Sequence, residues 1–168
     1  MTAEEFKSEV LPLGDKLFRY AVKFLEDRNE AQDAIQEIFI KLWSMKDRLK
    51  EYRSVEAFAM TMTRNYSIDQ LRKRRKVIEL DSISDSQITQ DPQNSAGIKD
   101  TTDHVKRIIK LLPDSQQEVI HLRDIEGLEF DEIAEITLMT VNNVRVNLSR
   151  ARNAVRVSII KLEQHGLE

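Results

Sequence analysis

The sequence predicts an all-α protein of two small helical domains joined by a flexible linker, and three observations lead to this prediction. Apolar residues recur every three to four positions in both halves of the 168-residue chain, which is the spacing of amphipathic helices. Glycine and proline are scarce, at 4 and 3 residues, and this argues against a β fold built on tight turns. One long polar segment without helical periodicity separates the halves. We therefore expect each half to form its own core.

The first domain is expected to cover residues 1–78 and to contain three helical stretches. The first stretch spans about residues 3–26, and Pro12 with Gly14 is expected to kink or split it. The second spans about residues 29–48. Its buried stripe is predicted from helical spacing to contain Ala31, Ala34, Ile35, Ile38, Phe39, Leu42 and Trp43. The third begins after Ser54, a residue type favoured at helix N-caps, and continues to about Lys76.

The linker is predicted at residues 79–100, with the sequence ELDSISDSQITQDPQNSAGIKD. It is rich in Ser, Asp and Gln, which is typical of a flexible connection. A structureless loop of this length inside one compact domain is improbable. The second domain is therefore expected to cover residues 101–168.

The second domain has the pattern of a helix-turn-helix. A helix over about residues 102–112 precedes Pro113, and Asp114 with Gln117 resembles a capping box for the next helix. Gly127 is a plausible helix stop. A short helix over 130–136, a tight turn and a long helix over about 140–162 follow, in the order typical of the motif.

The long last helix carries the residue types that read DNA bases. Its inner face is apolar, with Val144, Leu148, Ala151, Val155, Ile159 and Leu162. Arginine offers a donor fork to guanine, asparagine reads adenine and an exposed valine contacts a thymine methyl group. The outward residues that we predict to contact DNA are Asn142, Asn143, Arg145, Val146, Ser149 and Arg150. A solvated basic helix, or one that docks an acidic partner, is the alternative.

A second candidate nucleic-acid surface lies in the first domain. The third helix has a narrow polar strip that includes Thr61 and Asn65, and it ends in RKRRK, whose cations Arg72, Arg75 and Lys76 suit a phosphate backbone. Just before this helix, Tyr52 stands between two cations, Lys50 and Arg53, which is a combination able to stack an unpaired base. Each feature has an ordinary explanation, because cations favour a helix C-terminus and a single tyrosine commonly packs at the surface.

The second helix presents a different kind of surface. Opposite its apolar stripe it is expected to expose Asp33, Gln36 and Glu37. Ile40 also lies outside the stripe, and an apolar side chain among polar ones indicates a protein partner. Single exposed apolar residues are common, so this feature alone decides nothing.

Four segments in order resemble an extracytoplasmic-function (ECF) sigma factor of the sigma-70 family. They are DAIQEIFIKLW (33–43), SVEAFAMTMTRNYSIDQLRKRRK (54–76), LPDSQQEVIHLRDIEGLEFDEIAEI (112–136) and VNNVRVNLSRAR (141–152). The resemblance implies sigma regions two and four without a region-three domain, and promoter recognition with DNA melting as a subunit of RNA polymerase.

The resemblance also implies partners and residue roles. Asp33, Gln36, Glu37 and Ile40 would dock on core RNA polymerase. Promoter DNA would be contacted at the minus-10 element by Lys50, Tyr52, Arg53, Thr61, Asn65, Arg72, Arg75 and Lys76. The minus-35 element would be read by the six outward residues of the last helix. An anti-sigma factor, often membrane-anchored in this group, is a further implied partner.

The turn of the helix-turn-helix departs from the family pattern. Where relatives usually have glycine, this chain has Leu138, followed by Met139 and Thr140. Leucine does not adopt a positive φ cheaply, so the sequence predicts a longer or differently shaped turn. Asn142 and Asn143 replace the usual small pair that opens the recognition helix, and no promoter preference is therefore transferred from relatives.

Composition argues against other classes of protein. There is no cysteine, which fits a reducing cytoplasm, and no apolar run long enough to span a bilayer. The three histidines, His104, His121 and His165, have no spacing typical of a metal site or a triad, and no glycine-rich phosphate loop occurs. We expect no enzymatic activity, metal or cofactor. The alternative function is a free-standing helix-turn-helix regulator of duplex DNA, which would bind its site without polymerase.

Overall fold

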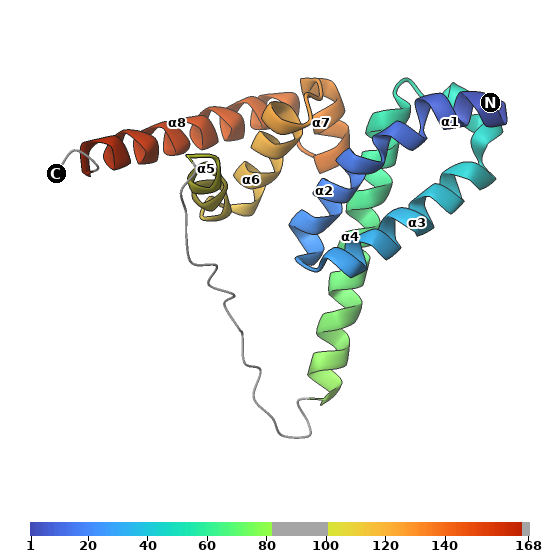
Figure 1. Cartoon of the computed structure of the whole chain (residues 1–168), viewed down its shortest axis with the longest axis horizontal. Coiled ribbons are helices and arrows are strands. Elements are labelled where there is room, and N and C mark those ends of the chain that lie inside the picture. Colours follow the sequence, from blue (N-terminus) through green and yellow to red (C-terminus); the bar gives the residue numbers. More distant parts are fainter. Residues whose placement is uncertain (82–100, 166–168) are drawn as a thin grey trace. The chain divides into compact units, whose positions relative to one another are not determined.

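The computed structural model describes residues 1–81 and 101–165, and these residues are helical with short connections (Figure 1). The chain divides into two compact units, Met1–Gln87 and Ile88–Glu168. The prediction of an all-α protein with two helical domains is confirmed. Residues 82–100 of the predicted linker lie outside the described residues, whereas residues 79–81 belong to a helix.

The first predicted helix is split at Pro12 and Gly14, as expected. Helix α1 (Ala3–Glu9) is followed by a 3₁₀ helix (Leu11–Leu13) and by α2 (Gly14–Leu25). Thr2 and Glu5 form a capping box that satisfies the first amides of α1. Because proline lacks an amide hydrogen, it is tolerated at the start of the 3₁₀ helix and the chain bends there.

The second predicted helix is shorter than the sequence suggested. Helix α3 (Arg28–Ser44) starts at the N-cap Asp27, whose carboxylate accepts hydrogen bonds from two backbone amides. It ends before residue 48, because the chain tightens into a 3₁₀ helix (Lys46–Glu51) that closes with an extended residue, Tyr52.

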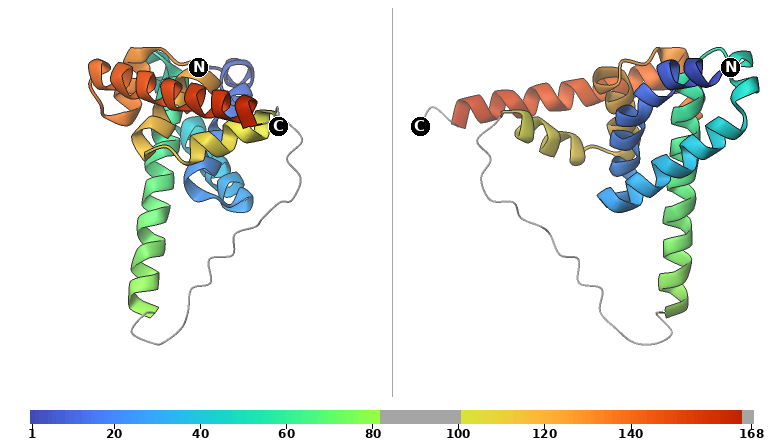
Figure 2. Two further views of the ribbon diagram at one scale, coloured as in Figure 1. Left: turned by 90° about the vertical axis from the view of Figure 1, so that its left-hand side faces the viewer. Right: turned by 45° about the vertical axis from the view of Figure 1, so that its right-hand side comes forward.

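The third predicted helix begins as expected and runs further. Ser54 Oγ accepts a hydrogen bond from the Ala57 amide, 3.1 Å away, and α4 (Val55–Asp81) follows. The C-terminal turns of α4 extend beyond the helices that pack on its first half (Figure 2). Residues 72–80 are all exposed, so the basic run stands free of the core.

Helices α2, α3 and α4 pack on one another around the first core. Leu17, Leu25, Ile38, Leu42 and Met60 are among its fully buried side chains. Most of the predicted α3 stripe is buried, but Trp43 is 44% exposed, so its assignment to the core was wrong. Its ring makes a T-shaped contact with the ring of Phe6 instead, with centroids 5.0 Å apart.

The second unit contains α5 (Thr101–Lys110), α6 (Asp114–Ile120), a short π-helical turn (His121–Ile125), α7 (Phe130–Thr137) and α8 (Val141–His165). The predicted Asp114 capping box is absent. Pro113 is the N-cap, and the Gln117 side chain turns back to donate to the carbonyl oxygens of Lys110 and Leu112. Gly127 ends the π turn at φ +77°, as its position suggested.

The core of this unit lies where α5, α6 and α7 pack against α8. Val144, Leu148 and Ala151 are buried on the inner face of α8, while Leu162, which was predicted to be on that face, is exposed. The core therefore covers only the N-terminal part of the long helix.

The turn between α7 and α8 also differs from the expectation. Leu138 adopts φ +60° and ψ +25°, and α8 begins after only Met139 and Thr140. The turn is therefore short and left-handed at the position where a leucine was expected to prevent this. Leu138 is 85% exposed, so its side chain makes few contacts with the rest of the protein. Its backbone carries the strain of the left-handed conformation.

Candidate functional site

The outward face of α8 is the first candidate site. The structure exposes all six residues that the sequence assigned to it, Asn142, Asn143, Arg145, Val146, Ser149 and Arg150. Thr140 Oγ1 caps the helix by accepting from the Asn143 amide, 3.1 Å away. This fixes the start of the helix and so the register of the exposed side chains. They form one polar surface with a single apolar member, Val146.

Arg145 lies against an aromatic ring that the sequence analysis did not single out. Its guanidinium carbon is 5.3 Å from the centroid of Phe130, the first residue of α7. Arg123, from the π turn, approaches the same ring at 4.8 Å. Phe130 and Arg145 are 15 positions apart, so no helical spacing in the sequence relates them.

A shallow groove of about 460 Å³ runs along this flank of α8. Its lining residues are Phe130, Arg145, Leu148, Ser149, Arg152, Asn153 and Arg156. Arg152 makes two hydrogen bonds to the Asp124 carboxylate, of 2.9 and 2.5 Å, and these bonds raise its pKa. Arg152 therefore joins α8 to the π turn, and its charge is already balanced.

The exposed face of α3 is the second candidate site. Asp33, Gln36, Glu37 and Ile40 are all exposed, and Ile40 has 62% of its surface open to solvent. Their spacing places them on one side of the helix. Burial raises the pKa of the Tyr66 hydroxyl on α4, and the nearby carboxylates of Glu37 and Asp33 raise it further.

The polar strip of α4 is only partly available. Asn65, Arg72, Arg75 and Lys76 are exposed as predicted, and Arg72 lies 3.9 Å from Asp69. Thr61 is half-buried, and its hydroxyl donates to the Ala57 carbonyl oxygen at 2.9 Å. The strip is therefore strongest at its basic end.

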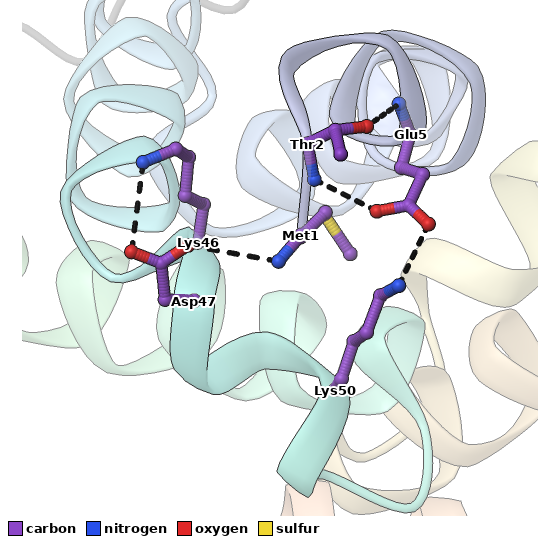
Figure 3. Close-up of polar contacts among 6 residues, drawn as sticks. All are labelled: Met1, Thr2, Glu5, Lys46, Asp47 and Lys50. Carbon is purple, nitrogen blue, oxygen red and sulfur yellow. Dashed lines mark hydrogen bonds and ion pairs between the residues drawn. The ribbon is translucent and has the colours of Figure 1, made fainter.

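Lys50, in the connection before α4, is already paired within the chain. Its ammonium lies 2.7 Å from Glu5 Oε1, while Glu5 Oε2 accepts from the Thr2 amide, also at 2.7 Å (Figure 3). The hydrogen bond from Lys50 lowers the pKa of Glu5 to about 2, and the same contact raises the pKa of Lys50. One carboxylate thus caps α1 and neutralises a lysine 45 positions away.

The same connection contains further intramolecular contacts. The Met1 amino group lies 3.6 Å from Asp47, which also pairs with Lys46 at 3.7 Å (Figure 3). Tyr52 stacks on Phe58 of α4, with centroids 3.9 Å apart and planes inclined by 24°. Lys50 and Tyr52 therefore both have intramolecular partners that the sequence did not reveal.

Other kinds of site are not found in the described parts of the chain. Residues 1–81 and 101–165 contain no group of three or more acidic or histidine side chains placed to hold a metal ion. No helix among them is both long and apolar enough to cross a membrane.

Comparisons with known proteins match both units. Residues 10–77 match the family model of sigma-70 region 2, and residues 103–155 match that of sigma-70 region 4. Together the two matches cover more than half of the chain. They correspond to the two helical units and include both candidate sites.

Individual relatives agree with these matches. The chain is 28% identical to the ECF RNA polymerase sigma factor SigW of Bacillus subtilis, over 84% of this chain and 82% of that protein. It is 28% identical to the ECF sigma-E factor of Escherichia coli K12, over 75% and 72%. The structure is similar to that of the sigma factor RpoE solved with the anti-sigma factor NepR from Bartonella quintana, with 26% identity, a TM-score of 0.72 and coverage of 94% and 98%.

Two helical units with these matches define a transcription initiation factor. The chain belongs to the extracytoplasmic-function group of the sigma-70 family, and it is an RNA polymerase sigma factor. Members of this family are non-catalytic initiation factors.

Proposed function

We propose that this sigma factor docks on core RNA polymerase through α3, opens the minus-10 element with the connection before α4 and the polar strip of α4, and reads the minus-35 element with α8. The observation that carries the proposal is the exposure of the predicted residues on α3 and α8 within the two matched regions. The assigned boundaries are residues 1–78 for region two, 79–100 for the linker and 101–168 for region four.

Polymerase docking is assigned to Asp33, Gln36, Glu37 and Ile40. The exposed apolar side chain of Ile40 beside two carboxylates suits a protein partner with a small apolar contact and a cationic rim. Docking would hold the two domains at a set separation, and two modest DNA contacts would then act together.

Minus-10 opening is assigned to Lys50, Tyr52, Arg53, Thr61, Asn65, Arg72, Arg75 and Lys76. Extruding a base costs a few kcal/mol of stacking and pairing, and a protein pocket that holds the base offsets this cost. Tyr52 already stacks on Phe58, so an extruded base would extend that stack or displace one ring. Lys50 would exchange Glu5 for a phosphate.

Minus-35 recognition is assigned to Asn142, Asn143, Arg145, Val146, Ser149 and Arg150. A helix without acidic residues over 142–161 meets no repulsion from the phosphates beside the major groove. Arginine and asparagine side chains supply base contacts, and Val146 supplies an apolar contact for a thymine methyl group.

The remaining assignments follow from this function. Because core polymerase and chromosomal DNA are cytoplasmic in bacteria, we place the protein in the cytoplasm and assign it no enzymatic activity. The RpoE structure contains an anti-sigma factor, and this supports the proposal that an anti-sigma factor holds this chain as well.

Binding of the purified full chain to bacterial core RNA polymerase tests the proposal. Charge reversal by Asp33→Arg or Glu37→Arg should weaken binding at least about tenfold, because like charges at an interface cost several kcal/mol. Glu135→Arg on α7 is the matched control, since it reverses an exposed acid in the other unit and should leave polymerase binding unchanged. Equal binding by all three variants would overturn the assignment to α3.

A further inference from the structure

The ring of Phe130 lies beside two arginines, one of which is on α8. It is the first residue of α7, and its half-buried ring lies within about 5.3 Å of two guanidinium groups, those of Arg123 and Arg145. Of these, Arg145 is a residue to which base reading is assigned, whereas Arg123 belongs to the π turn.

Several polar contacts hold the backbone around the ring. Glu129 and Glu132 form a capping box at the start of α7, in which the Glu129 amide donates to Glu132 Oε2 at 2.9 Å. Arg123 donates to the Leu128 carbonyl oxygen at 2.7 Å and lies 3.3 Å from Glu129 Oε2. The backbone on both sides of Phe130 is therefore tied by hydrogen bonds, which favour one position of the ring beside Arg145.

The kind of contact matters for recognition. A guanidinium that lies over an aromatic ring is attracted by the electrons of the ring face, and the contact uses none of its five N–H donors. Within residues 1–81 and 101–165, Arg145 pairs with no carboxylate. Arg152, about two helical turns further on, uses two of its donors on Asp124. Arg145 is thus held in place with its donor fork open.

We propose that Phe130 is a positioning residue for promoter recognition, which holds the Arg145 guanidinium in the orientation needed for base contact. The inference rests on the minus-35 role proposed for α8. Without the ring, the Arg145 side chain would sample several rotamers in the free protein. DNA binding would then have to order this side chain, and the entropy cost would weaken binding about two- to tenfold. The ring therefore contributes to specificity without itself reading a base.

A double-mutant cycle tests this proposal in the full chain bound to core polymerase. The probe is a pool of short DNA duplexes with randomised positions, from which the wild-type complex enriches its preferred sequences. Binding of the enriched duplexes is then measured at one fixed salt concentration for Phe130→Leu, Phe130→Tyr, Arg145→Ala and the double variant Phe130→Leu/Arg145→Ala.

Phe130→Leu is expected to weaken binding about two- to tenfold and to relax base preference at the same duplex position as Arg145→Ala. The double variant should bind no more weakly than Arg145→Ala alone, since the ring acts through that arginine. Phe130→Tyr keeps an aromatic face and should therefore retain the base preference of the wild-type protein. Circular dichroism of each variant checks that the helices remain intact.

Two results would overturn the proposal, and they are distinguishable. If the losses from Phe130→Leu and Arg145→Ala simply add, or if Phe130→Tyr is as weak as Phe130→Leu, the ring does not position Arg145, and the recognition role of α8 stands. If Arg145→Ala changes neither affinity nor base preference, both the positioning role and the assigned role of Arg145 fail.

Discussion

The two regions of this sigma factor that we propose to contact DNA hold their cations in opposite ways. In region four, Arg145 lies over the ring of Phe130 and keeps its hydrogen-bond donors open. In region two, Lys50 is bound to the carboxylate of Glu5 at 2.7 Å. Both residues are exposed, and a sequence shows only that both are cations.

The difference concerns what each region must give up on binding DNA. Arg145 gives up little, because a ring contact can persist beside a base. Lys50 must exchange one anion for another, so its net gain from a phosphate is small. We therefore expect region four to be ready for duplex DNA, while the Lys50 connection becomes available only when a stronger anion displaces Glu5.

The largest expected effect is the difference in DNA affinity between variants of these two cations. Arg145→Ala should lower affinity for the minus-35 duplex by about 1–3 kcal/mol, or roughly 5- to 150-fold. Lys50→Ala should change affinity for a single-stranded minus-10 oligonucleotide by less than about fivefold, because it removes only an exposed, already paired charge. Both are measured by fluorescence anisotropy of the polymerase complex. Equal losses of affinity for Arg145→Ala and Lys50→Ala would contradict the proposed difference between the two cations.

A second prediction compares the helix ends of the two regions. The C-cap residue of α2 is Glu26, with φ +58°, and that of α7 is Leu138, with φ +60°. Because glycine adopts this conformation without steric cost, Leu138→Gly and Glu26→Gly should each stabilise their own unit by about 0.5–1 kcal/mol. Urea unfolding followed by hydrogen exchange in α2 and α7 reports the two units separately.

Alanine variants provide the control for these helix ends. Leu138→Ala and Glu26→Ala keep the steric cost of a left-handed residue and should bring no stabilisation. A gain as large with alanine as with glycine would mean that side-chain removal, rather than backbone strain, is responsible.

The smallest expected effect concerns Glu5. Its depressed pKa means that the contact with Lys50 is fully present above pH 4.5 and is lost as the pH falls toward about 2. Nuclear magnetic resonance titration of the Glu5 carboxyl should give a pKa near 2, which returns toward 4.5 in Lys50→Ala. A value that Lys50→Ala leaves unchanged would contradict the pairing.

Removing the carboxylate should also release the lysine. Glu5→Gln is expected to strengthen single-strand binding about two- to fivefold at low salt, and the gain should fade as salt screens the charges. Glu4→Gln removes a neighbouring exposed charge from the same turn and should have a smaller effect, since Glu4 does not contact Lys50.

Sequence reasoning recovered the features that depend on near neighbours. The break at Pro12 and Gly14, the cap at Ser54 and the outward face of α8 each follow from residues a few positions apart. Helical spacing also separated Ile40 from the α3 stripe, but it placed Trp43 inside the core. The width of a buried stripe depends on how much of the helix its neighbours cover, and periodicity does not give that width.

The features that sequence reasoning missed depend on partners distant in sequence. Thr63 and Ser67 of α4 are fully buried although both are polar, because α4 is covered by α2 and α3 on two sides. Glu5 reaches Lys50 across 45 positions. At Leu138, local preference argued against a tight turn, and the packing of α7 and α8 on a shared core imposed it.

Trp43 is the only tryptophan in the chain, and its surroundings make it an optical reporter. Its indole makes a T-shaped contact with the ring of Phe6 in α1 and lies 5.3 Å from the ammonium of Lys46, which is close in sequence to Lys50. If α1 moves away when Glu5 releases Lys50, the indole loses an apolar neighbour and its emission should shift to longer wavelength. The chain therefore carries an intrinsic fluorophore close to the contact between Glu5 and Lys50, whose opening would accompany promoter melting. Stopped-flow fluorescence can time that opening without any label.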